Sequence, residues 1–397
     1  GKGLGASNLL NVMLYCRGFR SDWDQMPPGW QSHDMEPVFE ALEANLHLSE
    51  IDAGNFGEDV AATAEVLGFQ RRKRSLWTEP GITTQFHATV DSRSGQRLDL
   101  YRALGADAEN VTLVKGRVHR VLVDTDMCCS GVVLGDGRRL KVSPGGGEVV
   151  LCTGAVETPK ILQLSGIGPT SLLEHHNIRQ IKALPIGEGL KDHPLLAYPF
   201  VGTARPSSAE LSPNSVQGWI HDSEYGIQFV LIDGQAAPDI IPLGMINPFR
   251  RPGCCFASLF SVVQLIACLI RFVLAHCVCL RRQAYRVVGI NVCLVQPTST
   301  GRVFIKSADA SVDPVVDPQL LSTDQDRQNM QAGVRKLRAL LGSPPLKGRV
   351  SLDLSLGPSR DLTYAACSTS SYWHPTGTCR MGDCVDTELR VLGIGGL

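Results

Sequence analysis

The sequence predicts an α/β fold joined to an α+β part, and three observations support this. Residues 148–155 (EVVLCTGA) are almost wholly apolar, which is typical of a buried strand. Segments 111–124 and 130–141 alternate apolar and polar residues and predict a pair of strands with a turn at 135–137 (GDG). Strand and helix signals alternate up to about residue 195, after which the pattern of these signals is different.

Three helices accompany these strands, and each is marked by residues that favour helix ends. The first covers 29–46 and has apolar residues at helical spacing, the second follows the apolar strand directly, and the third covers 326–341. The marker residues are Ser32 for the first helix, Thr158, Pro159 and Gly166 for the second, and Ser322, Gln325 and Gly342 for the third.

The composition describes a globular chain with a small-molecule partner. The 397 residues are 43% hydrophobic, which excludes disorder, collagen and coiled coil. A net charge of -1 argues against nucleic-acid binding. The 13 cysteines are scattered and odd in number, which favours a reducing compartment. We expect an intracellular, organellar or membrane-associated protein. No targeting signal is readable, so the compartment itself stays unassigned.

The stretch 256–280 is the most apolar window and is long enough to cross a membrane. Arg271 lies near its middle, where a charge costs about 2.5–3.5 kcal/mol on insertion scales. We therefore expect a buried or membrane-surface helix that gives possible membrane contact, with a true span as the alternative.

His374 lies in the segment SSYWHPTGTCRMG. Pro375 disfavours helical backbone at the histidine, so His374 is expected in a stiff, extended segment next to Trp373. Such rigidity suits a catalytic group, although an isolated histidine is more often structural. The other segments of the sequence favour the catalytic role over the structural one.

The glycine-rich start GKGLGASNLLN would let backbone N–H groups approach a phosphate or a planar ring closely. No strand precedes it, so taken alone it predicts a loop. The cysteines show no paired CxxC motif, and we expect no metal site.

Taken together, these segments resemble the glucose-methanol-choline (GMC) family of flavin oxidoreductases. Residues 1–18 resemble the first family signature and residues 154–168 the second. Residues 184–194 (LPIGEGLKDHP), 297–318 and 374–397 resemble later family segments, and all five occur in family order.

The resemblance implies a doubly wound FAD-binding domain and a substrate domain with an antiparallel sheet and helices. The FAD-binding domain would cover 1–195 with a lid-like insertion around 19–80, the substrate domain 196–362, and the chain would return to the FAD-binding domain over 363–397. It also implies a fragment, because a GxGxxG unit of about 30 residues would precede residue 1 and a tail would follow residue 397.

The resemblance assigns His374 as the catalytic residue. Asn8, Ala6 and Gly189 depart from the family pattern, which has a serine, a glycine and an asparagine there. The residues that would contact FAD are Leu4, Gly5, Ala6, Ser7, Asn11, Val12, Met13, Leu14, Val118 and Gly154.

The implied reaction is the oxidation of an alcohol at its CH–OH group, with hydride transfer to flavin N5 and His374 as the base. A histidine with an ordinary pKa of about 6.5 can act as a base near neutral pH. The partners would be a small-molecule alcohol and an electron acceptor, either oxygen or a quinone. No metal and no nucleic acid are required.

Two alternatives remain open at this point. The chain also resembles the fatty acid photodecarboxylase branch of the family, but Val295-Gln296-Pro297 stands where that branch has Cys-Arg-Pro, so the arginine that would pair with a carboxylate is absent. The chain could otherwise be an inactive fragment or an incomplete gene model, because the implied flavin site lacks its first βαβ unit.

Overall fold

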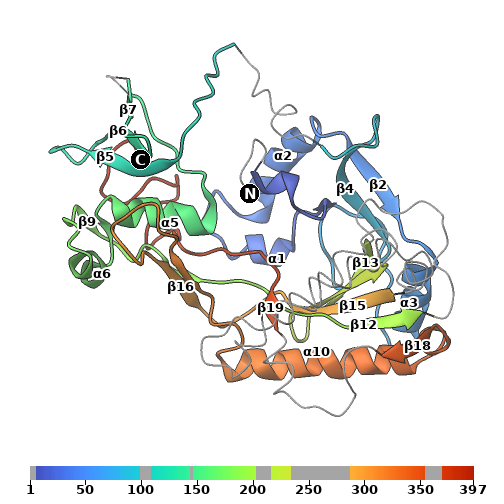
Figure 1. Cartoon of the computed structure of the whole chain (residues 1–397). Helices are drawn as coiled ribbons and strands as arrows, with labels where there is room; N and C mark the ends of the chain where they lie inside the picture. The colour runs from blue at the N-terminus through green and yellow to red at the C-terminus, as the bar shows by residue number, and fades with distance from the viewer. Residues whose placement is uncertain (1–5, 99–108, 144–145, 203–215, 234–286, 354–368) are drawn as a thin grey trace, which may run out of the picture. The chain divides into compact units, whose positions relative to one another are not determined.

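The computed structural model describes residues 6–98, 109–143, 146–202, 216–233, 287–353 and 369–397 (Figure 1). The chain forms two compact units, which are described separately. Unit 1 contains residues 1–111, 194–296 and 324–372, and unit 2 contains residues 112–193, 297–323 and 373–397. The assignment of an FAD-binding domain and a substrate domain to these segments stays a prediction.

Unit 1 is built on a large antiparallel sheet. Its main path runs β18-β12-β15-β14-β13-β3, and β11 joins it by pairing with β15 and with β19. The strands are β3 (Gly81–Thr83), β11 (Pro194–Leu196), β12 (Pro199–Gly202), β13 (Val216–Asp222), β14 (Ile227–Asp233), β15 (Val287–Leu294), β18 (Val350–Asp353) and β19 (Ser370–Ser371).

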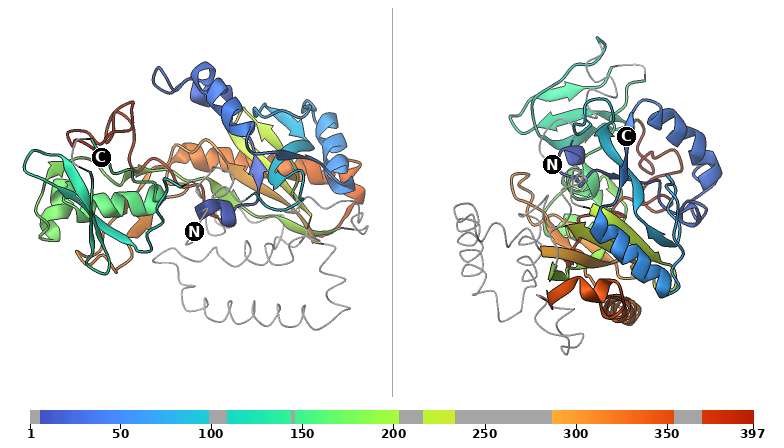
Figure 2. Two further views of the ribbon diagram at one scale, coloured as in Figure 1. Left: turned by 90° about the horizontal axis from the view of Figure 1, so that it is seen from above. Right: turned by 90° about the vertical axis from the view of Figure 1, so that its right-hand side faces the viewer.

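Helix α10 (Asp324–Gly342) packs along this sheet, as both views show (Figures 1 and 2). Met330, Leu337 and Leu340 are fully buried and recur on one face of the helix. Gly333 lets the helix come close, because a Cβ there would lie 2.8 Å from a methyl group of Val292. The predicted helix over 326–341 is confirmed, with its start two residues earlier.

A second, three-stranded sheet of unit 1 has the order β1-β4-β2. The predicted surface helix over 29–46 is confirmed as α2, but Gln31 is the N-cap residue rather than Ser32, because Gln31 and Asp34 form the capping box. The elements are η1 (Ala6–Leu9), β1 (Leu14–Tyr15), α1 (Arg20–Trp23), α2 (Ser32–Glu43), β2 (Leu48–Asp52), α3 (Asn55–Val66), β4 (Gln85–Asp91) and η3 (Leu346–Gly348).

Unit 2 packs around helix α5, whose inner side joins a cluster with Val121, Ile186, Cys384 and Ile394. Three small sheets belong to this unit: β5-β6-β7, β10-β16-β17 and the parallel pair β8-β9. The elements are β5 (Val118–Val123), β6 (Cys129–Leu134), β7 (Arg139–Lys141), α5 (Gly154–Leu164), β8 (Ile167–Gly168), α6 (Thr170–His175), β9 (Lys182–Ala183), β10 (Glu188–Leu190), β16 (Gly301–Phe304) and β17 (Val315–Asp317).

The predicted buried strand over 148–155 is wrong. No strand forms there, Val150 is 77% exposed, and α5 already begins at Gly154. An apolar run becomes a buried strand only where neighbouring strands and helices cover it, and within the described residues Val149 makes one backbone hydrogen bond, to the carbonyl of Gly396. Thr158 and Pro159 therefore lie inside α5 instead of at its start.

The other strand predictions hold in part. Residues 111–117 are not in a strand, and β5 starts at Val118. The segment 130–141 forms a hairpin of β6 and β7 around the predicted turn at 135–137. The mixed α/β class is confirmed, whereas the apolar stretch 256–280 lies outside the described residues. Among the residues that are described, no helix has the length and apolar character to cross a membrane.

His221 on β13 makes the stability of unit 1 sensitive to acid. The ring is buried against Phe19, with ring centroids 4.8 Å apart, and Nδ1 has no hydrogen-bond partner among the described residues. Burial lowers the pKa of His221 to about 3. The unfolded chain binds the proton near pH 6.5 and the folded chain does not, so stability is lost as pH falls below that value.

We expect the unfolding free energy to fall by about 2 kcal/mol through this residue between about pH 7 and pH 5. Urea denaturation of wild type and His221→Gln at both pH values measures this as the difference between their pH slopes. His33→Gln is the control, because the His33 side chain is 73% exposed, and it should keep the wild-type slope. Equal slopes for His221→Gln and wild type would contradict the assignment.

Candidate active site

The candidate site in unit 2 is formed by two segments that run antiparallel, 187–193 and 374–378. Lys191 and Thr376 exchange both backbone hydrogen bonds, each 2.9 Å long, and the Gly187 amide donates to the Thr378 carbonyl at 2.8 Å. Gly377 is required at this approach, because its φ is +87° and a Cβ would lie 2.5 Å from the Gly189 carbonyl oxygen. The two segments therefore form a close-packed ladder.

Asp192 ties the ends of this ladder together. Its carboxylate is buried, and Oδ1 accepts hydrogen bonds from the backbone N–H of His193 at 2.8 Å and of His374 at 3.0 Å. One carboxylate oxygen thus holds the backbone of both histidines. Hydrogen bonds to a charged acceptor are stronger than those between neutral groups, so this carboxylate fixes the backbone positions from which both imidazole side chains extend.

The imidazoles of His193 and His374 lie in direct contact. Their Nδ1 atoms are 3.1 Å apart, and the rings meet edge to face with centroids 5.2 Å apart. His374 itself is exposed, and Trp373 before it is 70% exposed with a φ of 58°. Partial desolvation lowers the pKa of His374 below its ordinary value, and the Asp192 charge acts in the opposite direction. His374 is thus a neutral, accessible imidazole near pH 7.

Sequence reasoning missed His193. A signal was present, because His193 and His374 each precede a proline, Pro194 and Pro375, and share the same backbone restriction. The pair is separated by 181 positions in the chain, so only the ladder of unit 2 brings the two rings together.

The predicted cofactor residues in unit 1 lie on η1 and the loop that follows it. Ser7, Asn11 and Val12 are exposed. Met13 is buried with Ala88, and its backbone N–H donates to Asn11 Oδ1 at 3.0 Å. Ala6 belongs to η1 and half-buried Leu14 to β1, whereas Leu4 and Gly5 lie outside the described residues.

Asn8, at one of the positions that depart from the family pattern, is the buried polar residue of this loop. Its Nδ2 donates to the Leu98 carbonyl, and its Oδ1 has no hydrogen-bond partner among the described residues. A buried amide oxygen without a donor is costly, so the loop is suited to a ligand that supplies one.

The predicted cofactor residues in unit 2 are Val118 and Gly154. Val118 is the half-buried first residue of β5. Gly154 opens α5 with a φ of +81°, and a Cβ there would meet nothing within 4 Å. Within the part of the chain that the structure describes, the side chain of the N-cap residue Thr153 makes no capping hydrogen bond to this helix start, whose backbone N–H groups suit an anion.

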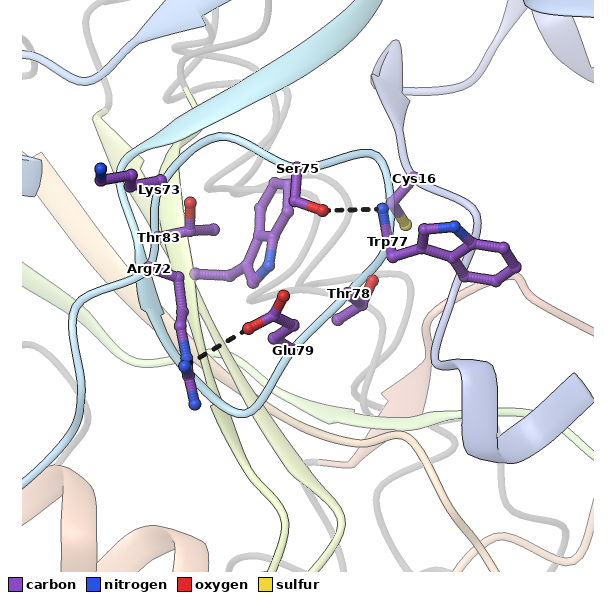
Figure 3. A pocket seen from close by; sticks show the side chains of 9 residues that line it. Cys16, Arg72, Lys73, Ser75, Trp77, Thr78, Glu79 and Thr83 are labelled. Carbon is purple, nitrogen blue, oxygen red and sulfur yellow. Dashed lines mark hydrogen bonds and ion pairs between the residues drawn. The ribbon is translucent and has the colours of Figure 1, made fainter. Parts of the chain in front are cut away.

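Unit 1 also contains a small pocket (Figure 3). Trp77 and Trp219 supply aromatic walls, and Arg72 pairs with Glu79 at 3.3 Å across the rim. None of the predicted site residues lines it. Among the described residues, no three His, Cys, Asp or Glu side chains lie together in a way that could hold a metal ion.

Comparison with known proteins identifies relatives over the whole chain. Two sequence models described as GMC oxidoreductase match residues 1–195 and 297–397. The chain is 31% identical to choline oxidase of Arthrobacter globiformis over 93% of this chain and 68% of that protein. It is 29% identical to an uncharacterized GMC-type oxidoreductase of Mycobacterium tuberculosis over 100% of this chain and 79% of that protein.

Among solved structures, formate oxidase of Aspergillus oryzae RIB40 shares the fold. It matches with a TM-score of 0.77 and 20% identity, covering 100% of this chain and 78% of the oxidase.

Proposed function

This chain belongs to the GMC oxidoreductase family, and from that premise we propose that it oxidises a small-molecule alcohol at its CH–OH group with FAD as cofactor. The observation that carries the proposal is the exposed, neutral imidazole of His374, held by Asp192 beside His193. The relatives described above are named as oxidoreductases, so neither the photodecarboxylase nor the inactive-fragment alternative is favoured.

The described residues offer polar groups that fit FAD. The loop of Ser7 and Asn11 offers small and amide side chains with exposed surface, and Asn8 adds an unsatisfied buried oxygen. The uncapped start of α5 at Gly154 offers backbone N–H groups and no Cβ in the way, as a phosphate requires. The residues of the described chain that we propose hold the cofactor are therefore Ala6, Ser7, Asn11, Val12, Met13, Leu14, Val118 and Gly154, together with Leu4 and Gly5.

FAD, when bound, supplies the acceptor for the hydride that leaves the alcohol carbon. His374 has the complementary task of taking the hydroxyl proton as the C–H bond breaks. The Asp192 carboxylate stabilises the imidazolium that results, because it lies at the backbone of the same residue. The electron acceptor for the bound cofactor would be oxygen or a quinone.

Anaerobic mixing of the purified full-length protein with alcohols tests this function. We expect the flavin absorbance to bleach with at least one member of a panel of aliphatic, aromatic and amino alcohols. A purified protein without flavin absorbance would contradict the proposal, and so would light-dependent release of CO₂ from a fatty acid without any alcohol oxidation.

The rate of flavin reduction is expected to depend on pH through His374. Desolvation lowers the pKa of His374 below the ordinary histidine value of about 6.5. The imidazole should therefore lose its activity as a base only at pH values below its own lowered pKa, where the rate should fall about tenfold per pH unit. Stopped-flow measurements between about pH 4.5 and 8.5 give the profile. His374→Ala should lack this inflection, and an inflection above pH 7 would assign the base to another group.

A further inference from the structure

The contact between the two imidazoles restricts their protonation. A neutral imidazole carries one N–H, so two Nδ1 atoms 3.1 Å apart are joined only if one donates and the other accepts. When both rings are neutral, His193 and His374 are therefore in opposite tautomers. The one with its proton on Nδ1 has its lone pair on Nε2, and the other has its proton on Nε2.

The surroundings hold this contact in place from three directions. Asp192 Oδ1 accepts the backbone N–H groups of both histidines, and the Lys191–Thr376 ladder continues from them. A proline follows each histidine and restricts its backbone. The two rings are packed at an interplanar angle of 79°, with their centroids 5.2 Å apart. The pair is thus built by the fold rather than formed by two mobile side chains.

We infer that His193 is a positioning residue for His374, whose Nδ1–H it accepts at its own Nδ1, so that the Nε2 lone pair of His374 can receive the hydroxyl proton of the alcohol. This inference rests on the proposed function. In the step itself the O–H bond of the substrate breaks and an Nε2–H bond forms, while the Nδ1–H of His374 stays in its hydrogen bond with His193.

The protonated form of His374 determines which of the two histidines donates in the hydrogen bond between them. Once His374 has taken the proton, both of its nitrogens are donors, and only a neutral His193 with its lone pair on Nδ1 can remain in contact. The bond then becomes charge-assisted and stronger, and no ring has to turn. If His193 were the donor instead, neutral His374 would carry its single proton on Nε2. That nitrogen would then have no lone pair to accept the hydroxyl proton.

Variants at His193 test the inference by kinetics. His193→Ala is expected to slow flavin reduction about 10- to 100-fold, as the loss of an orienting partner typically does. His193→Asn keeps an acceptor oxygen near the position of Nδ1 and should stay within about fivefold of wild type. In a His374→Ala background, His193→Ala should have no further effect, because its partner is already absent.

The matched control is His175→Ala. His175 and His176 in the same unit also meet edge to face, with centroids 4.8 Å apart, and neither belongs to the candidate site. This variant should reduce its flavin at the wild-type rate. Equal losses in His193→Ala and His193→Asn, or a full additional loss in the His374→Ala background, would overturn the inference.

A second readout is independent of activity. In protein labelled with ¹⁵N at histidine, NMR should show the proton of His374 on Nδ1 in wild type and in His193→Asn, and a shift of the proton toward Nε2 in His193→Ala. An unchanged tautomer in His193→Ala would overturn the inference even if alcohol oxidation is confirmed. If no alcohol reduces the flavin, the proposed function fails, and this measurement still decides whether His193 sets the tautomer.

Discussion

Replacing His374 with alanine is expected to slow flavin reduction by about 10²–10⁴-fold, the usual effect of removing a positioned acid–base group. The imidazole is accessible, its Nδ1 contacts His193, and its lowered pKa leaves it neutral near pH 7. Without it, the hydroxyl proton loses the acceptor that we propose for it. Rapid anaerobic mixing with an alcohol that wild type oxidises measures this step without contributions from the electron acceptor.

The FAD content of His374→Ala should remain near that of wild type. His374 is held by Asp192, whereas the residues proposed to hold FAD are a different set, such as Ser7, Asn11 and Gly154. Flavin absorbance per protein and His175→Ala serve as controls. Wild-type reduction rates in His374→Ala, with a substrate that wild type clearly oxidises, would leave this histidine with a structural role alone.

The largest expected change in stability comes from Arg17, a buried charge in unit 1. Its guanidinium binds the Glu43 carboxylate, with Nε 2.8 Å from Oε1, and Tyr15 donates a further hydrogen bond to the same carboxylate. The guanidinium also lies over the rings of Phe39 and Trp77, 5.5 and 5.4 Å from their centroids. Arg17 thus links the segment that follows β1 to α2 through its contacts with Glu43 and Phe39.

Arg17→Leu should lower the unfolding free energy by about 3–5 kcal/mol, because it leaves a largely buried carboxylate without its cation. Arg20→Leu is the matched control. Arg20 pairs with Glu36 at 2.8 Å, but its side chain is 47% exposed, and such surface pairs contribute about 0–1 kcal/mol. Urea unfolding of both variants gives the comparison, and similar losses in the two would show that burial of Arg17 is not what matters.

Helices α2 and α10 could be predicted from the sequence because their signals are local. Apolar positions three or four apart lie within one segment, so the pattern that predicts each helix can be recognised without the rest of the chain. The β6–β7 hairpin was predictable for the same reason, since Gly135, Asp136 and Gly137 favour the turn by their own backbone preferences.

The structure of segment 148–155 could not be predicted from its local sequence. Its apolar residues resemble those of a buried strand, yet Val150 is exposed and α5 begins at Gly154. Strand formation depends on hydrogen-bond partners that come from elsewhere in the chain, and apolarity does not reveal whether they are present.

The sequence by itself determined the family, through signatures in a fixed order from residue 1 to residue 397, and the same resemblance singled out His374, which precedes Pro375. Only the tertiary structure brought His193 to within 3.1 Å of it and placed Asp192 under both. The physical reason is that the ladder of 187–193 with 374–378 forms between segments about 180 positions apart, and such pairing depends on the packing of the whole unit, which no local pattern of residues encodes.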